Sequence, residues 1–175
     1  MFLNEIQEKQ RRISKNLNQT QAIKNSTGLT LRFPSAYRVA KVDSNFVWIR
    51  RDIETGSVNL FVSRYNDKDN SSVLKIRDSI SKHHIPGPVE NTFMSIDLIY
   101  TPSSQQISIR GKQILETRGL WEIKGQFMAG PFLNYQFESN TKQDEYIMLD
   151  GFVYSPGSSK SCLLYTSDAA DEKRW

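Results

Sequence analysis

Two neighbouring histidines are the first candidates for chemistry in this sequence. His83 and His84 are the only histidines among 175 residues. Because adjacent side chains diverge on a helix or a strand, the two rings cannot readily hold one metal ion without distant ligands. A serine nucleophile needs a histidine base and an orienting partner, and no serine stands in a Gly-x-Ser-x-Gly motif. We therefore predict no catalytic residue, no metal site and no cofactor, and expect both histidines at the exposed end of a helix.

A second candidate group lies on one predicted strand. Glu116, Arg118 and Glu122 share a face of this strand, because alternate residues point the same way. The two carboxylates are about 20 Å apart along an extended chain, too far for the acid pair of a glycosidase. Glu116 and Arg118 are close enough for a salt bridge, or for an arginine that is held ready for an anionic ligand. We expect the salt bridge and keep both residues as binding candidates.

Three apolar side chains complete the binding candidates. Trp121, on the opposite face of the same strand, is predicted to fill the core beneath a helix, with a binding role as the alternative. Phe127 and Met128 precede Gly130 in an apolar loop, which either tucks into the core or presents an interaction knob. Of these two options for the loop, we expect packing.

Alternating polar and apolar residues predict a framework of strands that positions these side chains. The predicted strands are 29–33, 37–42, 46–49, 58–63, 93–100, 106–110, 113–123, 131–138 and 145–154. The second half of the chain shows no alternation of strands and helices, which favours antiparallel pairing. The spacing of Val73, Ile76 and Ile80 predicts a helix from Ser72 to His83, which ends before Pro86.

The N-terminal segment has a helical pattern. Phe2, Ile6, Ile13 and Leu17 form an interrupted apolar stripe at helical spacing among charged and amide residues. This stripe predicts a long amphipathic helix over 1–25 that links to an upstream half absent from this sequence. The expected fold class is therefore α+β, with a predominantly antiparallel sheet packed against one helix and preceded by the long amphipathic N-terminal helix.

The C-terminal segment resembles foreign sequence. Residues 162–172 resemble the translated adapter of a sequencing library and contain the only cysteine, Cys162. We therefore divide the chain into a linker helix over 1–25, an α+β domain over 29–161 that is truncated at its C-terminus, and a non-native tail over 162–175.

Composition narrows the function classes. Hydrophobic residues make up 38% of the chain, enough for a sizeable core. No stretch approaches the about 20 consecutive apolar residues of a membrane helix. The net charge is +4, but the basic residues are scattered, so we expect no nucleic-acid partner.

A series of short motifs follows the order found in a known family. The motifs are Gln10-Arg11-Arg12-Ile13, Phe33-Pro34-Ser35-Ala36-Tyr37-Arg38-Val39-Ala40, Asn45-Phe46-Val47-Trp48, Arg77-Asp78-Ser79-Ile80, Ile85-Pro86-Gly87-Pro88, Glu116-Thr117-Arg118-Gly119-Leu120-Trp121, Phe127-Met128-Ala129-Gly130-Pro131-Phe132 and Gly151-Phe152-Val153-Tyr154. In these motifs the chain resembles domain-of-unknown-function family 4837. Members of that family look like envelope lipoproteins of Gram-negative bacteria. The resemblance implies a location in the cell envelope or periplasm, as a lipoprotein, and supplies no catalytic residues.

The expected function follows from the resemblance and from the lack of catalytic groups. We expect a non-catalytic envelope module that binds or supports an envelope protein or another macromolecule. Any contact with the membrane is expected through an anchor outside this fragment. The alternative is a hydrolase or transferase whose active site lies partly in the missing half, with Glu116 or Arg118 contributing. A deep cleft lined by these two residues favours the alternative, whereas an ion pair on a flat sheet face removes its motivation.

Overall fold

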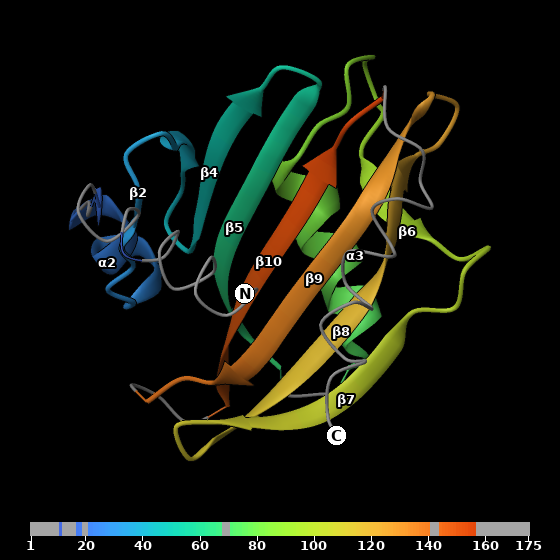
Figure 1. The fold of residues 1–175 in the computed structure, drawn as a ribbon. Helices are drawn as coiled ribbons and strands as arrows, with labels where there is room; N and C mark the ends of the chain where they lie inside the picture. Colours follow the sequence, from blue (N-terminus) through green and yellow to red (C-terminus); the bar gives the residue numbers. More distant parts are fainter. Residues whose placement is uncertain (1–10, 12–16, 19–20, 68–70, 141–143, 157–175) are drawn as a thin grey trace, which may run out of the picture.

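Antiparallel strands form most of the described protein. The computed structural model describes residues 11, 17–18, 21–67, 71–140 and 144–156, and Figure 1 shows their arrangement. The elements are, in chain order, β1 (Leu17–Asn18), α2 (Gln21–Thr27), β2 (Phe33–Pro34), β3 (Arg38–Val42), β4 (Phe46–Ile53), β5 (Gly56–Asn66), α3 (Val73–His84), β6 (Met94–Asp97), β7 (Ser103–Ile109), β8 (Lys112–Ile123), β9 (Met128–Glu138) and β10 (Glu145–Tyr154).

One large sheet dominates the fold. Its strands follow the order β3-β4-β5-β10-β9-β8-β6, and β7 pairs with β8 beside β6. All of these pairings are antiparallel. The last strand of the described residues, β10, lies in the middle of the sheet, between β5 and β9. On the side of β8 away from β9, β7 pairs with the first part of β8 and β6 pairs with the last part. The edge of the sheet therefore consists of two short strands in succession.

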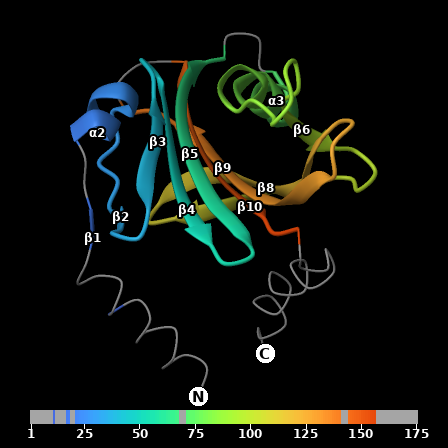
Figure 2. The ribbon, with the colours of Figure 1, turned by 90° about the horizontal axis from the view of Figure 1, so that it is seen from above.

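The sheet curls around α3. Figure 2 shows α3 on the concave side of the sheet, whereas α2 lies outside its β3–β5 end. The alternation of side chains in β4 explains both layers, because successive residues point to opposite faces. Phe46 belongs to the cluster beneath α3, and Val47 and Ile49 belong to the cluster that packs against Ile23 of α2.

The face of α3 that packs against the sheet is partly polar. Its most buried residues are Val73, Arg77, Ser81 and His84, which recur at the three- and four-residue spacing of one helical face. The helix ends as predicted before Pro86, which cannot continue it. None of the helices among the described residues is long and apolar enough to span a membrane.

The predicted fold class is wrong, because the described part of the N-terminal segment contains no long helix. Leu17–Asn18 pair with Phe33–Pro34 as strands, which interrupts the predicted helix, and the helix that follows spans only Gln21–Thr27. A helix this short depends on tertiary packing, and α2 obtains it by burying Ile23 against the sheet. The described protein is therefore mostly a curled antiparallel sheet with short helices, rather than an α+β fold.

Parts of the predicted linker helix and the whole predicted tail lie in segments that the structure does not describe. Positions 1–10 and 12–16 of the predicted linker helix lie outside the described residues, as does the predicted non-native tail over 162–175.

Candidate functional site

A cleft of about 270 Å³ opens between the concave face of the sheet and the loop that follows α3. We call it the aromatic cleft. It is lined by Trp48, Arg50, Ser57, Asn59, Ile85, Pro86, Gly87, Pro88, Met94, Trp121, Ile123, Met128, Phe152 and Tyr154. Neighbouring strands contribute most of these side chains at alternate positions, so the regular pleat of the sheet places them on one face.

Aromatic rings form the floor of the aromatic cleft. The ring of Trp121 meets that of Phe152 edge to face, with the centroids 5.7 Å apart, and Phe152 lies 6.5 Å from Trp48. Such tilted and edge-on contacts are the favoured geometries of aromatic pairs. The indole nitrogen of Trp121 donates a hydrogen bond to the carbonyl oxygen of Val153 at 3.1 Å. These contacts hold the floor in a fixed shape.

A glycine makes this floor possible. Gly130 of β9 lies directly opposite Trp121 of β8. A Cβ atom at position 130 would collide with the carbonyl oxygen of Val153 and lie 3.0 Å from the indole nitrogen of Trp121. The absence of a side chain therefore allows Trp121 to reach its backbone acceptor.

The wall opposite the sheet is a short proline-rich loop. The amide of Ile85 donates to the carbonyl of Ser81 at 2.8 Å, which ends α3. The amide of Gly87 donates to the carbonyl of Thr92, and Pro86 forms a bridge with Phe93. Because proline fixes the backbone φ angle, this wall has little freedom to collapse into the cleft.

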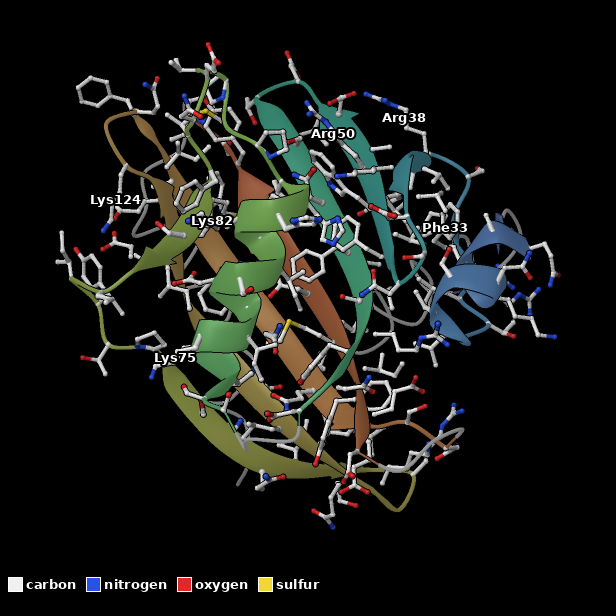
Figure 3. The ribbon with its side chains drawn as sticks, turned by 180° about the vertical axis from the view of Figure 1, so that it is seen from behind. Phe33, Arg38, Arg50, Lys75, Lys82 and Lys124 are labelled. Atoms are coloured by element: carbon white, nitrogen blue, oxygen red, sulfur yellow. The ribbon has the colours of Figure 1, made fainter. Side chains whose placement is uncertain are left out.

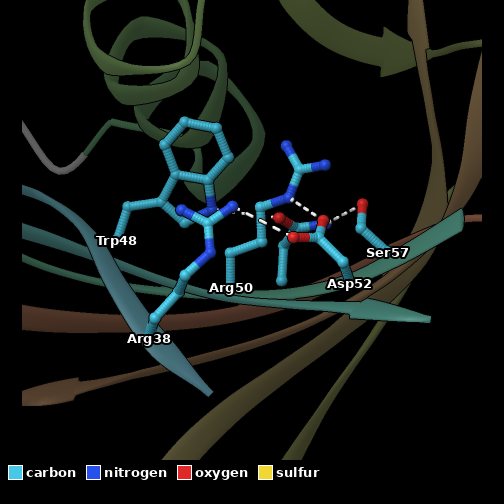
Figure 4. A network of polar contacts seen from close by, with 6 residues as sticks. Arg38, Trp48, Arg50, Asp52 and Ser57 are labelled. Carbon is cyan, nitrogen blue, oxygen red and sulfur yellow. Dashed lines mark hydrogen bonds and ion pairs between the residues drawn. The ribbon is translucent and has the colours of Figure 1, made fainter. Parts of the chain in front are cut away.

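One side of the aromatic cleft is polar. The indole nitrogen of Trp48 donates to Oδ1 of Asn59 at 3.1 Å, and Nδ2 of Asn59 donates to Oγ of Ser57 at 3.0 Å. Next to them, Nε of Arg50 donates to Oδ1 of Asp52 at 2.7 Å (Figure 4). The cleft therefore offers hydrogen-bonding groups along one side and apolar surface elsewhere.

Two arginines share one carboxylate at this polar side. Nη2 of Arg38 donates to Oδ2 of Asp52 at 3.0 Å, opposite the contact made by Arg50 (Figure 4). Hydrogen bonds from Arg38 and Arg50 lower the pKa of Asp52, so its carboxylate is ionised at neutral pH. The net charge of this group is positive, which favours an anionic ligand.

A second groove lies at the other end of the sheet. It has a volume of about 550 Å³ and is lined by Gln106, Lys112, Gln113, Leu115, Gln136, Phe137, Glu138, Asn140 and Tyr146. Strands β8 and β9 are not paired beyond Leu115 and Gln136, and the groove opens at this end. Lys112 donates to Oδ1 of Asn140 at 2.9 Å. Two aromatic residues, Phe137 and Tyr146, line this mostly polar groove, whereas four line the aromatic cleft, which is therefore the stronger candidate for binding an apolar group.

The predicted salt bridge between Glu116 and Arg118 is confirmed. Nε of Arg118 donates to Oε1 of Glu116 at 2.9 Å, and Nε2 of Gln105 donates to the same oxygen at 2.8 Å. Burial raises the pKa of Glu116, but hydrogen bonds from Gln105, Tyr135 and Arg118 outweigh it and leave that pKa below its usual value. Neither Glu116 nor Arg118 lines the aromatic cleft or the polar groove.

The other three predicted binding residues lie in different environments. Trp121 is buried, as predicted for a core residue, and also lines the aromatic cleft together with half-buried Met128. Phe127 is fully exposed, with a relative accessibility of 106%, so the expectation that it packs into the core is wrong. It lies in the turn between β8 and β9, where Gly125 has a φ of +76° and the hairpin reverses away from the core. Their roles in binding stay predictions.

The histidines end α3 as predicted, but only one of them is exposed. His83 faces solvent, whereas His84 is buried and its ring stacks on Phe46 with centroids 4.0 Å apart. Burial lowers the pKa of His84, with Lys41 and His83 acting in the same direction. The expected surface position is therefore wrong for His84.

Sequence reasoning missed the polar groups on the concave face. Arg77 and Asp150 form a buried ion pair beneath α3, and Asn134 joins it. A signal existed for Asp150, which interrupts the apolar run of β10 at a position pointing toward α3. Arg50 and Asn59 carried no comparable signal, because alternating polar residues are expected on a strand with one solvated face.

Comparisons with known proteins assign the chain to a family. A search of curated proteins found no match. The family model of Domain of unknown function (DUF4837) matches residues 16–170, which include β1 to β10 and both clefts. This protein therefore belongs to the DUF4837 family.

Proposed function

We propose that the protein is a non-catalytic binding module of the cell envelope that holds an apolar side chain of a partner protein, next to an acidic residue, in the aromatic cleft. The observation that carries the proposal is the combination of aromatic floor and arginine at one opening. Ligand sites are typically apolar clefts with a few polar groups that fix orientation. The aromatic cleft has this composition.

The size of the cleft suggests the kind of group that enters it. About 270 Å³ is near the lower end of ligand pockets, which span about 300–1,000 Å³. That space suits one aromatic or branched aliphatic side chain rather than a large cofactor. Interface hot spots commonly consist of such a side chain in a preformed pocket.

Arg50 suggests the charge of the neighbouring group. Its Nε atom contacts Asp52, and its side chain is 37% exposed. Its terminal guanidinium N–H groups form no hydrogen bond or ion pair with the other described residues, so they can meet a carboxylate of the partner in a two-point contact. An acidic residue beside the inserted side chain satisfies this geometry.

The chemistry of the lining favours binding over catalysis. The residues that line the aromatic cleft include no carboxylate, histidine or cysteine. Ser57 accepts a hydrogen bond from Asn59 and has no base beside it in the lining. Glu116 and Arg118, which carried the enzyme alternative, are engaged in their ion pair away from both clefts.

The envelope location is supported by the sequence resemblance to envelope lipoproteins. The test is fractionation of cells that express the intact reading frame with a C-terminal epitope tag. We expect the protein in the membrane fraction, released as a lipid-modified species by detergent. Recovery in the cytosolic fraction contradicts the envelope part of the proposal and leaves the binding part standing.

Trp48 and Trp121 allow a direct test of the cleft, because both indoles line it and their fluorescence should respond to an inserted group. The probes are three capped pentapeptides: Gly-Ser-Phe-Asp-Gly, the same peptide with Asn in place of Asp, and the same peptide with Ala in place of Phe. We expect saturable binding of the first, roughly fivefold weaker binding of the second, as for a half-exposed charged hydrogen bond, and none of the third.

Two adjacent arginines supply a matched control. Arg50 points to the aromatic cleft, whereas Arg51 is on the opposite face of β4. Arg50→Gln should remove the preference for Asp over Asn in the peptide, and Arg51→Gln should keep it. Equal behaviour of the two variants, or no saturable binding of any peptide, contradicts the proposed function.

A further inference from the structure

Two exposed apolar protrusions project from one side of the protein. Phe127 lies in the β8–β9 hairpin and is fully exposed. Leu98, Ile99 and Tyr100, in the connection between β6 and β7, are 73%, 84% and 55% exposed. Figures 1 and 2 both show the hairpin and this connection on the same side of the molecule. Exposed apolar clusters of this kind commonly mark interaction surfaces.

The fold holds the two protrusions in fixed relative positions. Asp97, the last residue of β6, pairs with Leu120 of β8, and Ile123 of β8 pairs with Met128 at the base of the hairpin. The two bases are therefore about 10 Å apart along one strand. The amide of Ile99 also donates to Oδ1 of Asp97 at 3.0 Å. The apolar side chains are thus presented by a rigid support.

The two protruding segments carry one basic residue and no acidic one, and Glu122 lines a surface hollow together with Phe127. The segments 98–102 and 124–127 contain Lys124 and no acidic residue. Exposed Lys75 and Lys82 lie on the outer face of α3. Figure 3 shows all three lysines in the half of the molecule that also carries β6 and the β8–β9 hairpin. Lysine heads with apolar neighbours are typical of segments that bind anionic lipid surfaces.

We propose that this side of the protein docks directly on an anionic lipid membrane, with Phe127 and the side chains of Leu98–Tyr100 inserted at the interface. Apolar insertion and attraction of lysines to the lipid headgroups act together in such binding. A second copy of the chain is a poorer occupant, because the interface would then contain the same lysines from both copies. The proposal goes beyond the aromatic cleft, which neither protrusion lines.

Vesicle co-sedimentation of the 175-residue chain tests the proposal. Vesicles of phosphatidylethanolamine with phosphatidylglycerol should bind the protein, and added salt should weaken the binding. Vesicles of phosphatidylcholine alone should bind it less. Absence of binding to the anionic vesicles overturns the proposal.

Matched variants separate the apolar and charged contributions. Each of Ile99→Ser and Phe127→Ser should weaken vesicle binding by about tenfold. Val42→Ser on the opposite edge, where Val42 is 46% exposed, should leave binding unchanged. Because all of these side chains are exposed, the variants should keep the circular dichroism and melting profile of the parent.

Charge variants follow the same logic. The double variant Lys82→Gln with Lys124→Gln should lose about fivefold in binding per lysine. The double variant Lys24→Gln with Arg51→Gln removes the same charge from the face covered by α2 and should bind as the parent does. An equal loss in both double variants shows a general charge effect and overturns the assignment to this side.

A depth measurement distinguishes lipid from protein as the occupant. A Phe127→Trp variant should show additional fluorescence that brominated lipids quench, whereas Val42→Trp should show none. Analytical sedimentation of the protein without vesicles tests the alternative, self-association. Concentration-dependent self-association that Phe127→Ser abolishes, without quenching in Phe127→Trp, identifies a second copy as the occupant and overturns the membrane proposal.

Discussion

Arg77 of α3 and Asp150 of β10 form a two-point ion pair, and both side chains are completely buried. Nε and Nη2 of Arg77 donate to the two carboxylate oxygens of Asp150 at 2.7 and 3.1 Å. Nδ2 of Asn134 donates to the same carboxylate at 2.8 Å, and the guanidinium lies 3.8 Å from the ring centroid of Phe132. This pair joins the helix to the central strand of the sheet.

Removing one partner of this pair should destabilise the protein strongly. Asp150→Ala or Arg77→Ala leaves an uncompensated buried charge, which typically costs about 3–5 kcal/mol of unfolding free energy. The double variant Arg77→Met with Asp150→Leu should cost much less than the sum of the single changes. Guanidinium unfolding measures these differences.

The exposed pair of Arg50 and Asp52 provides the comparison. Its side chains are 37% and 52% exposed, so water screens their attraction. Asp52→Ala should leave the unfolding midpoint nearly unchanged. A loss as large as that of Asp150→Ala would show that burial is not what makes the Arg77 pair important.

His84 should make stability fall in mild acid. Its pKa in the folded protein lies below the ordinary value of 6.5, because burial disfavours the imidazolium form. The unfolded chain therefore binds the proton more readily, and the stability contributed by neutral His84 is lost as the pH falls below 6.5. His84→Phe keeps a ring that can stack on Phe46 and should flatten this pH dependence. Unfolding midpoints between pH 5 and 8, measured by denaturant titration, check the prediction; an unchanged slope in the variant contradicts it.

Glu116 should contribute stability in a different pH range. Its pKa lies below the ordinary value of 4.5, so the stabilisation is present above pH 4.5 and is lost as the pH falls through the folded value. Glu116→Gln should cost about 1–3 kcal/mol at neutral pH, as expected for charged hydrogen bonds. The difference between parent and variant should shrink in acid. A constant difference across the acid range would contradict an ionic role.

Two glycines of the central strands should respond differently to an added methyl group. Gly130→Ala places a Cβ atom against the Val153 carbonyl and the Trp121 indole, so it should cost about 1–3 kcal/mol through overpacking. It should also change the near-ultraviolet circular dichroism of Trp121. In Gly151→Ala the nearest atoms are 3.9 Å away, and we expect little change. Equal melting temperatures of the two variants would show that position 130 has more space than the structure indicates.

Local patterns predicted the strands far better than the N-terminal helix. Glu145–Tyr154 forms a strand with the predicted bounds, because β-branched and aromatic residues alternate there between polar turns. Arg110 and Gly111 both have positive φ, as a tight hairpin turn requires. The apolar stripe ending at Leu17 was misleading, because Leu17 pairs in a strand with Pro34. Helical spacing alone could not show which partner an apolar residue would find.

The site depended on contacts between distant parts of the chain. Trp121 and Met128 were predicted as binding candidates, and both line the aromatic cleft. Phe152 and Trp48 join them only because β10 enters the sheet between β5 and β9. Strand order is a property of the whole fold, so local alternation could not reveal this cleft. The exposure of Phe127 likewise follows from the direction in which a hairpin leaves the sheet.

The central place of β10 has a consequence for synthesis of the protein. Translation produces β3 to β5 and then β6 to β9 before the strand that joins these two ribbons has emerged. During that interval each nascent ribbon carries an open hydrogen-bonding edge, and Arg77 lacks its counterion. The sheet is completed only when residues up to Tyr154 are free of the ribosome, so protection of those edges on the growing chain is a requirement of this strand order.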